Sequence, residues 1–388
     1  MTIPRFVDIH LLQTIPYANL NRDDLGSPKS VVYGGVTRTR VSSQCWKRAT
    51  REALDAQLPD RAVRTRRVVI EVAERLREDG WPDDLADYAA RQLLTAAGAQ
   101  RAKSKKKDGD DDGGLALEEN GYTSVLLFLP ASALDDLAAL ARRERAELER
   151  THASGKNGKS PFTQEEVRAL LTGRTGTIAL FGRMLAELPG GKVDGAVQVA
   201  HAFTTHATDT EVDFFTAVDD TLPPEETGSG HMNSAEFSAG VFYRYATVDV
   251  VNLIDNLDGD VDIARQLVER FLAAFATAMP TGKRTATAPH TLPDLAYIAV
   301  RADRPVSLAA AFERPVRAGW DAGGWAEPSR RQLADYANVL HQMWGTGGLV
   351  QHAYVSVDPK PLDGLGDKTG SFPALVTAAV DAVFTGRG

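Results

Sequence analysis

One run of residues constrains the fold of this chain more than any other. Residues 236–249, read Glu-Phe-Ser-Ala-Gly-Val-Phe-Tyr-Arg-Tyr-Ala-Thr-Val-Asp, are rich in aromatic and β-branched side chains and contain no proline. Such side chains fit the pleated surface of a β-strand. A nearly continuous apolar run of this kind indicates a strand that is buried on both faces. We therefore expect this segment to lie centrally in a sheet.

The patterns around this strand follow a defined order. We predict a buried strand at residues 6–13 and a helix at 42–58, capped by Ser42 or Ser43. Two strands at 196–205 and 211–218 are predicted to form a hairpin. A helix at 263–278, a strand at 295–300 and a short helix at 307–312 follow. The order strand, helix, strand pair, helix and strand is that of a ferredoxin-like, RNA-recognition-type domain. The fold class is therefore predicted as α+β. The tail adds a helix, a strand and a helix at residues 329–344, 353–357 and 372–384.

A block of helical patterns interrupts this domain. The patterns lie at residues 68–76, 85–97, 131–148 and 163–171, and the last begins with the capping box Thr163-x-x-Glu166. We predict a helical insertion over residues 58–175, with the sheet domain formed by residues 1–57 and 176–388. Within the insertion, residues 101–114 consist of lysine, aspartate and glycine with almost nothing apolar, which favours a solvated loop.

The composition excludes several classes of protein. The chain has 388 residues and a single cysteine, Cys45, so a disulfide framework and a multi-cysteine zinc site are excluded. No stretch approaches the ~18 consecutive apolar residues of a membrane span, and the first residues do not resemble a signal peptide. We expect a cytoplasmic protein without a cofactor.

The charge of the chain is distributed unevenly. The net charge is −8, which argues against a surface that attracts polyanions everywhere. Residues 20–51 nevertheless carry seven basic side chains against two acidic ones, Asp23 and Asp24. The basic residues of this segment are Arg22, Lys29, Arg38, Arg40, Lys47, Arg48 and Arg51.

The predicted helix that begins near Ser43 has a basic side. Gln44, Lys47, Arg48 and Arg51 recur at spacings of three and four residues, so they share one face. Cations in the first turns oppose the helix dipole unless an anion joins them. The pattern therefore fits a site for a phosphodiester chain, and it fits equally a solvated face that pairs with acidic residues of the same molecule.

Two further groups of residues have open interpretations. Adjacent Phe214 and Phe215 must point to opposite faces of their strand, so one ring can project and stack on a base, or both can cover hydrophobic surface. Met184 and Met232 are typical of apolar packing. The basic loop with Lys283 and Arg284 is compatible with a simple turn.

Catalytic patterns are sparse. His201 and His206 are predicted on opposite faces of a strand, and Cys45 lies on the packed side of its helix. The pairs Asp23–Asp24 and Asp219–Asp220 could bind a divalent metal, although acidic pairs are common in loops. The sequence thus predicts no catalytic residues and no metal site. A metal-dependent nuclease that uses Asp23 or Asp24 is the alternative.

Several motifs together resemble the CasC family, the repeated backbone subunit of the type I-E CRISPR surveillance complex Cascade. They occur in order along the chain, and the clearest are Asn21-Arg22-Asp23-Asp24, Arg40-Val41-Ser42-Ser43-Gln44-x-x-Lys47-Arg48, Gly182-Arg183-Met184, Lys192-Val193-Asp194-Gly195-Ala196, Thr204-Thr205-His206, Phe215-Thr216-Ala217-Val218-Asp219-Asp220 and Glu236-Phe237-Ser238-x-Gly240-Val241-Phe242-Tyr243-Arg244-Tyr245.

The resemblance implies a hand-shaped, non-catalytic molecule. It implies an RNA-recognition-type palm, helical fingers at residues 58–175, and a hairpin thumb at about residues 190–235. Copies are expected to polymerise along a CRISPR guide RNA, to displace one base at regular intervals, and to present the guide to target DNA beside other Cascade subunits.

The resemblance also implies roles for individual residues. Guide-backbone contacts are expected from the basic helix face, the connector before it and the basic loop, at Arg22, Lys29, Gln44, Lys47, Arg48, Arg51, Lys283 and Arg284. Apolar elements around the displaced base are expected at Met184, Phe215 and Met232.

Overall fold

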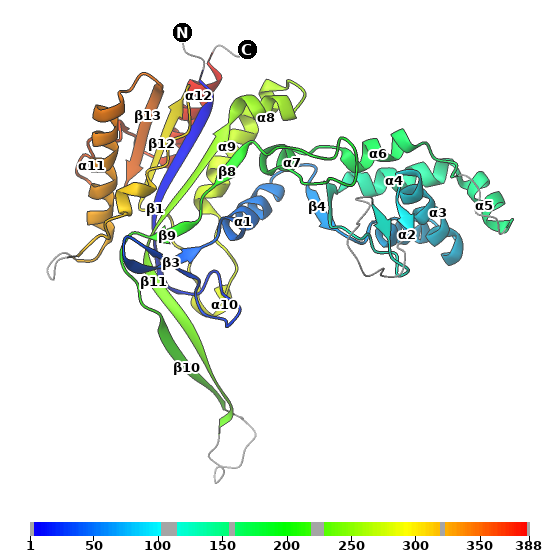
Figure 1. The fold of residues 1–388 in the computed structure, drawn as a ribbon, viewed down its shortest axis with the longest axis horizontal. Helices are drawn as coiled ribbons and strands as arrows, with labels where there is room; N and C mark the ends of the chain where they lie inside the picture. Colours follow the sequence, from blue (N-terminus) through cyan, green and yellow to red (C-terminus); the bar gives the residue numbers. More distant parts are fainter. Residues whose placement is uncertain (1–3, 102–114, 155–159, 219–228, 319–322, 386–388) are drawn as a thin grey trace. The chain divides into compact units, whose positions relative to one another are not determined.

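The computed structural model describes residues 4–101, 115–154, 160–218, 229–318 and 323–385 (Figure 1). The chain divides into two compact units. The first, called here the sheet unit, comprises residues 1–54, 197–254 and 260–388, and the second, the helical unit, comprises residues 55–196 and 255–259. The predicted loop at 101–114 lies, apart from its first residue, outside the described residues.

The sheet unit is built on one large, mostly antiparallel sheet. Its main path runs β14-β13-β12-β1-β11-β9-β3-β2, and β8 and β10 also pair with β11. The strands are β1 (Phe6–Ala18), β2 (Ser30–Tyr33), β3 (Val36–Val41), β8 (Val197–Val199), β9 (Ala202–Thr204), β10 (Glu211–Val218), β11 (Ser229–Asp249), β12 (Leu295–Arg301), β13 (Leu349–Ser356) and β14 (Asp367–Lys368). The prediction of a mixed α and β protein is confirmed.

The segment singled out in the sequence lies in the middle of this sheet. It forms the second half of β11, which pairs with β1 from Phe6 opposite Asp249 onward and with β8 and β9 on its other side. β1 continues to Ala18 instead of ending at residue 13. The pairing shifts register between Ile15 and Ala18. Such an irregularity accommodates Pro16, which has no N–H to donate to the ladder.

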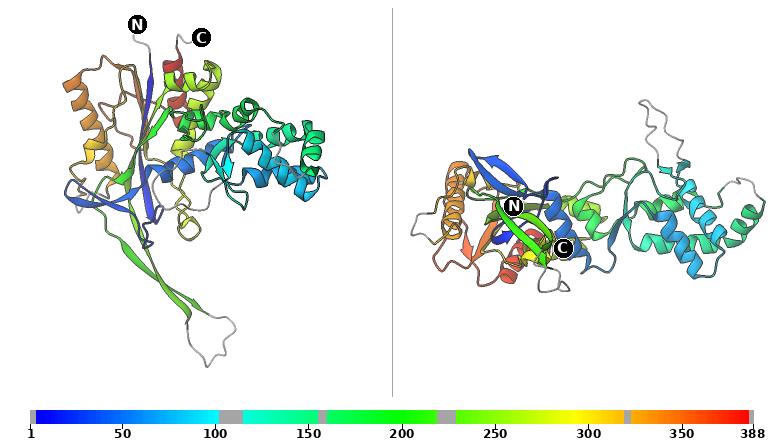
Figure 2. Two further views of the ribbon diagram at one scale, coloured as in Figure 1. Left: turned by 45° about the vertical axis from the view of Figure 1, so that its right-hand side comes forward. Right: turned by 90° about the horizontal axis from the view of Figure 1, so that it is seen from below.

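The predicted hairpin between residues 196–205 and 211–218 is wrong. β10 pairs with the strand that follows it, with Glu211 opposite Phe237 and Phe214 opposite Ser234. The earlier segment instead forms the short strands β8 and β9, which pair with β11 inside the sheet. The reason is the length of β11, 21 residues. Its first half extends beyond the sheet and, paired with β10, forms a projecting arm (Figures 1 and 2).

Helices cover both faces of the sheet. They are α1 (Ser43–Asp55), α8 (Val250–Asn256), α9 (Val261–Thr277), α10 (Arg284–Thr287), α11 (Ala326–Trp344) and α12 (Phe372–Phe384). Tyr243 packs in a core cluster with Leu333 of α11. The next residue, Arg244, faces the opposite side and contacts Trp46 of α1. The helix predicted at 307–312 is a short 3-10 helix, Ala309–Phe312.

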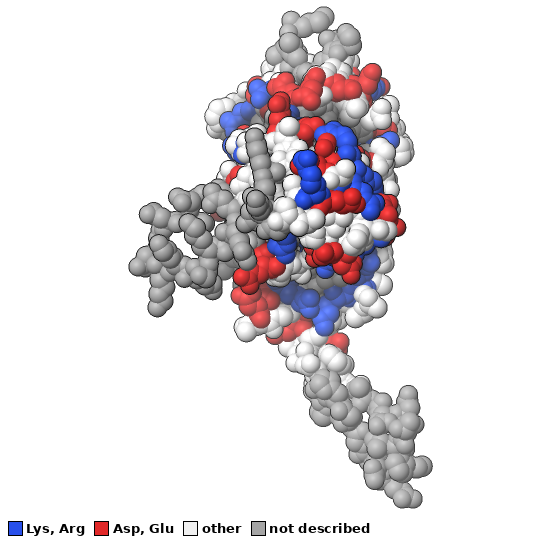
Figure 3. Space-filling model, turned by 90° about the vertical axis from the view of Figure 1, so that its right-hand side faces the viewer, with Lys and Arg blue, Asp and Glu red and all other residues white. Residues whose placement is uncertain are grey.

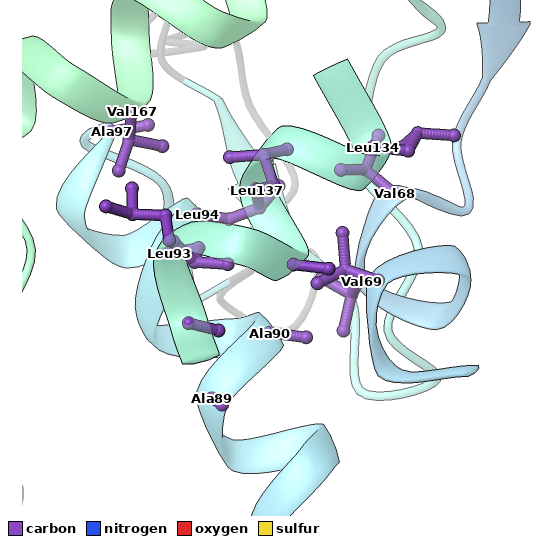
Figure 4. Packing of buried hydrophobic residues seen from close by; sticks show 14 of the residues in the cluster. Val68, Val69, Ala89, Ala90, Leu93, Leu94, Ala97, Leu134, Leu137 and Val167 are labelled. Atoms are coloured by element: carbon purple, nitrogen blue, oxygen red, sulfur yellow. The ribbon is translucent and has the colours of Figure 1, made fainter. Parts of the chain in front are cut away.

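The helical unit has its own core. Its helices are α2 (Val68–Glu78), α3 (Asp83–Ala96), α4 (Ser132–Arg143), α5 (Arg145–Ala153), α6 (Gln164–Thr172) and α7 (Gly176–Phe181). Its strands form two pairs, β4 (Ala62–Thr65) with β7 (Leu127–Pro130) and β5 (Gln100–Arg101) with β6 (Ala116–Leu117). Val69, Leu93 and Leu137 are buried together between these helices (Figure 4). The capping box is confirmed, because the Thr163 hydroxyl accepts the Glu166 N–H at 3.3 Å.

Two boundaries of this unit differ from the prediction. The helix expected at 131–148 breaks at Glu144 into α4 and α5. The unit also runs to residue 196 rather than 175. Arg183 explains the second difference, because its buried guanidinium donates to the carbonyl oxygens of Gly173 and Gly191 at 2.8 and 2.6 Å. These bonds tie the segment after α7 to the rest of the unit.

Within the described residues, no helix is long and apolar enough to cross a membrane.

A buried carboxylate joins strands in the centre of the sheet unit. Asp8 is fully buried and accepts from Arg301 Nε at 3.1 Å, from the Val306 N–H at 2.9 Å and from the Tyr245 hydroxyl at 3.0 Å. Loss of hydration outweighs these partners and raises the pKa of Asp8 to about 6. The folded state therefore binds the proton of Asp8 more tightly than the unfolded chain does.

This raised pKa predicts a specific pH dependence of stability. The contribution of protonated Asp8 is fully present below its ordinary pKa of 3.8 and is lost as the pH rises through about 6. We expect the stability advantage of the wild type over Asp8→Asn to shrink by about 2 kcal/mol between pH 4 and pH 7. Urea unfolding of both proteins, followed by tryptophan fluorescence, measures the difference. A difference that is constant or that grows with pH would contradict the prediction.

Candidate nucleic-acid interface

The start of α1 is attached to residues 19–29, called here the connector, which link β1 to β2. The Ser42 hydroxyl accepts the Cys45 N–H at 3.3 Å, which caps the helix as its sequence predicts. The Asn21 side chain accepts the Ser42 N–H at 2.9 Å. Arg22, the next residue of the connector, is exposed. The connector and the first turn of α1 are therefore one structural element.

Backbone contacts join Arg40 of β3 to Lys29 at the end of the connector, and the loop with Lys283 and Arg284 packs against the connector. The Lys29 N–H donates to the Asn21 carbonyl at 2.9 Å, and the Arg40 N–H donates to the Lys29 carbonyl at 2.7 Å. A Cβ atom on Gly282 would lie 2.5 Å from the Leu20 carbonyl oxygen, so only glycine allows this approach. The loop with Lys283 and Arg284 thus packs against the connector. An open cavity of about 440 Å³ lies here, lined by Arg22, Asp23, Asp24 and Gly282 among others.

The basic residues of α1 differ in how their charge is compensated. Arg48 is highly exposed and its Nε lies 2.8 Å from Glu52 Oε1, which raises the pKa of Arg48. Arg51 also approaches Glu52, at 3.8 Å. Lys47 is half-buried, has no ion-pair partner among the described residues, and has its pKa lowered by burial. Glu52 therefore partly neutralises Arg48 and Arg51, whereas the charge of Lys47 is not compensated by an acidic side chain of the described residues. Gln44, on the same helix, is exposed.

Two buried arginines, Arg244 and Arg38, stabilise the parts of the sheet next to this surface. The Arg244 guanidinium lies 3.6 Å from the Trp46 ring centre and donates to Gln13 Oε1 at 2.5 Å. Its burial lowers the pKa of Arg244 to about 9. Arg38, counted among the basic residues of the sequence, is also buried and donates to the carbonyl oxygens of Thr204 and Phe312 at 2.8 and 2.9 Å. Arg38 therefore stabilises the fold and does not contribute to the exposed basic surface.

The candidate metal ligand Asp23 is used by its own loop. Its Oδ1 accepts the backbone N–H groups of Leu25 and Ser27, each at 2.9 Å. Such bonds close a local turn. In the parts of the chain that the structure describes, no three histidine, cysteine, aspartate or glutamate residues come together as a metal site. The second pair, Asp219–Asp220, lies outside the described residues.

The projecting arm exposes two aromatic rings on opposite faces. Phe214 is 60% and Phe215 43% exposed. Neighbouring residues of a strand alternate in direction, so Phe214 shares its face with Val212, whereas Phe215 shares its face with the acidic residues Glu211 and Asp213. The alternation predicted from the sequence is present, and both rings are available for contacts.

The two methionines of the predicted base wedge have different surroundings. Met184 is almost fully exposed and belongs to the helical unit. The backbone of Met232 pairs opposite Thr216 on the arm, and its side chain is outside the described part of the structure. A common site for Met184, Phe215 and Met232 therefore stays a prediction.

One residue of this surface, His201, has no sequence pattern that indicates its place there. His201, between β8 and β9, lies with its Nδ1 3.0 Å from the Ser43 nitrogen and 3.2 Å from Arg40 Nη1. Neither His201 nor His206 is in β9, so the prediction that they share a strand is wrong. The contact joins residues that are 158 positions apart in the chain. No local pattern could have indicated it.

Charged side chains of both signs lie close together on one face of the molecule. On the face shown in Figure 3, Lys and Arg gather in patches beside Asp and Glu rather than covering the molecule. A local group of basic side chains on a net negative chain is a surface that can attract the phosphates of a nucleic acid.

Comparisons with known proteins place the chain in one family. The family model described as CT1975-like protein matches residues 7–378. A solved chain from a "CRISPR RNA-guided surveillance complex, pre-nicking" is 48% identical, with 98% of this chain and 100% of that chain covered and a TM-score of 0.87. Another, from a "CRISPR RNA-guided surveillance complex", is 42% identical, with 97% and 99% covered and a TM-score of 0.76. No match was found among curated proteins.

The chain therefore belongs to the CT1975-like family. This is the CasC family of type I-E Cascade backbone subunits that the sequence motifs indicated, so that resemblance is confirmed.

Proposed function

We propose that the chain is a non-catalytic backbone subunit of the type I-E CRISPR surveillance complex Cascade and binds the guide RNA. The observation that carries this proposal is the likeness over 98% of the chain, at 48% identity, to a subunit of an RNA-guided surveillance complex. The surface formed by the connector, the start of α1 and the basic loop supplies the corresponding chemistry. Cations and N–H groups there can bind phosphates of an RNA backbone.

The strand order supports an RNA-recognition-type palm. β12, β1, β11 and β9 are neighbours in that order. In the chain, α1 comes after β1 with the paired strands β2 and β3 between them, and α9 lies between β11 and β12. This is the arrangement of a ferredoxin-like domain, with β8 and β9 as a divided second strand. The helical unit then corresponds to the fingers. The thumb, predicted at about residues 190–235, then corresponds to the arm formed by β10 and the first half of β11.

A backbone subunit must accept any guide sequence. Contacts to phosphate and ribose carry no sequence information, so Arg22, Lys29, Gln44, Lys47, Lys283 and Arg284 can bind every guide in the same way. Arg48 and Arg51 belong to the same surface with part of their charge held by Glu52. Sequence is then read by base pairing between the guide and target DNA.

The arm supplies the means of interrupting this pairing. Exposed Phe215 can stack on a base, and stacking is worth about 1–3 kcal/mol per base. A base held in this way at each subunit divides the guide into short segments, which can pair with target DNA without winding continuously around it. The partners of this proposal are guide RNA, further copies of the chain, other Cascade subunits and, through the guide, target DNA, all met in the cytoplasm.

The first test concerns Lys47. Reversal of its charge in Lys47→Glu is expected to weaken RNA binding at least tenfold and to reduce the slope of log affinity against log salt by about 0.7, the value for one phosphate of a single strand. The double variant Arg48→Gln with Glu52→Gln is expected to have a smaller effect, because the ion pair that it removes carries no net charge. Filter binding of a guide-length RNA over a salt series measures both.

The matched control for this test is Arg150→Glu. Arg150 is an exposed arginine of α5 that pairs with Glu147 in the helical unit. Its reversal changes the net charge by the same amount, so a loss equal to that of Lys47→Glu would attribute the effect to overall charge and overturn the assignment.

The second test concerns the arm. Phe215→Ala is expected to remove the distinct chemical reactivity of one guide nucleotide per subunit, because the displaced base loses its stacking partner. Chemical probing of the guide in the assembled complex measures this pattern. Phe214→Ala, on the other face of the same strand, is the control and is expected to leave that signature in place. An unchanged pattern in Phe215→Ala would refute the wedge role.

The third test separates a scaffold from a nuclease. With a complementary RNA and Mg²⁺, the assembled protein is expected to produce no evenly spaced cuts. Asp23→Ala is expected to weaken guide binding about threefold, because the loop beside Arg22 loses two hydrogen bonds of ~1 kcal/mol or less each. Evenly spaced cuts in the wild type that disappear in Asp23→Ala and Asp24→Ala would establish the nuclease instead.

A further inference from the structure

His201 connects three segments of the basic surface. It follows β8, which pairs with β11, while its ring contacts Ser43 at the start of α1 and Arg40 at the end of β3. Both contacts reach the same ring atom, Nδ1, at 3.0 Å from the Ser43 nitrogen and 3.2 Å from Arg40 Nη1. The side chain is otherwise exposed.

These contacts determine the tautomer of the ring. A backbone N–H and a guanidinium can only donate hydrogen bonds. Nδ1 must therefore be the acceptor, so the ring is neutral and its single proton is on Nε2. The charged groups that face the ring are Arg40 from β3 and Lys29 from the connector. Partial burial and these two cations lower the pKa of His201, which agrees with a ring that stays neutral at physiological pH.

The outer nitrogen of the ring is placed to bind an acceptor. Nδ1 and Nε2 lie on opposite sides of an imidazole, so the Nε2–H points away from Ser43 while Nδ1 is held. The cations that face the ring, Arg40 and Lys29, favour a negatively charged or oxygen-rich partner. A phosphate oxygen or a ribose hydroxyl of RNA has this chemistry.

We propose that His201 is an RNA-binding residue, which donates its Nε2–H to the sugar-phosphate backbone of the guide while its Nδ1 holds the first turn of α1 and Arg40 in position. The inference rests on the proposed function and adds a second neutral hydrogen-bond donor, besides Gln44, to a largely cationic surface. A neutral donor gives no counterion release, so its loss weakens binding without changing the dependence on salt.

Two substitutions separate the two sides of the ring. In His201→Asn, the Oδ1 atom can replace Nδ1 as acceptor of the Ser43 N–H, but the outward donor is lost. In His201→Gln, the longer side chain can place an amide N–H near the position of Nε2, but the acceptor for Ser43 is lost. We expect RNA affinity to fall about tenfold in His201→Asn and about threefold in His201→Gln, with the salt slope of the wild type in both.

The controls make the result specific. His152→Asn, in α5 of the helical unit, removes an imidazole outside this surface and is expected to bind RNA as the wild type does. A greater loss in His201→Gln than in His201→Asn, or equal losses in the two, would show that His201 only caps α1, and would overturn the proposal. If Lys47→Glu also bound RNA normally, the proposed function would fail as well, so the two failures are distinguishable.

A measurement without RNA tests the tautomer directly. In protein labelled with ¹⁵N-histidine, the His201 signals, assigned by their absence in His201→Asn, are expected to show a protonated Nε2 and an unprotonated Nδ1 at pH 7. The ring is expected to titrate below the ordinary value of 6.5. A ring protonated on Nδ1 at pH 7, or one that titrates at or above 6.5, would contradict the proposal.

Discussion

The pairing of β1 with β11 is the interaction on which the rest of the structure depends. It brings together residues that are more than two hundred positions apart and fixes which side chains face each side of the sheet. Tyr243 thereby faces α11, whereas Arg244 faces α1 and α9. A shift of one residue would exchange these two side chains and place the guanidinium in the apolar cluster. The basic surface therefore has its position because this register is held.

Three buried arginines stabilise the fold through hydrogen bonds that apolar side chains cannot make. Arg38, Arg183 and Arg244 each bind backbone carbonyls or an amide, rather than a carboxylate, and each joins segments that are distant in the chain, Arg183 through the Phe128 carbonyl. A planar group with five donors can satisfy several carbonyls at fixed angles. These contacts account for the order of loops that would otherwise contain unpaired carbonyl groups, including the segment between Gly182 and Gly191.

The sequence predicted much of this structure and part of the surface. The central strand, α1, α9 and α12 have local signals, namely β-branched runs, caps and amphipathic spacing, and they were located within a few residues. The partner of β10 was predicted wrongly, because the short polar segment before β10 favoured a tight turn to the preceding strand, whereas β10 pairs with the strand that follows it. Likewise, the burial of Arg38 and the contacts of His201 depend on pairs of residues far apart in the chain.

The continuity of β11 has a mechanical consequence. The same strand forms the middle of the sheet and one side of the arm, without a joint between them. At the base of the arm, the Asn19 amide donates to the carbonyls of Glu236 and Gly26 at 2.8 and 2.9 Å. Asn19 therefore links the arm to the loop that contains Arg22 by hydrogen bonds. The arm is thus an extension of the sheet that is fixed at one end only. A force on its aromatic end is carried into the hydrogen-bonded centre of the protein and into the adjoining loop, instead of being absorbed by a hinge.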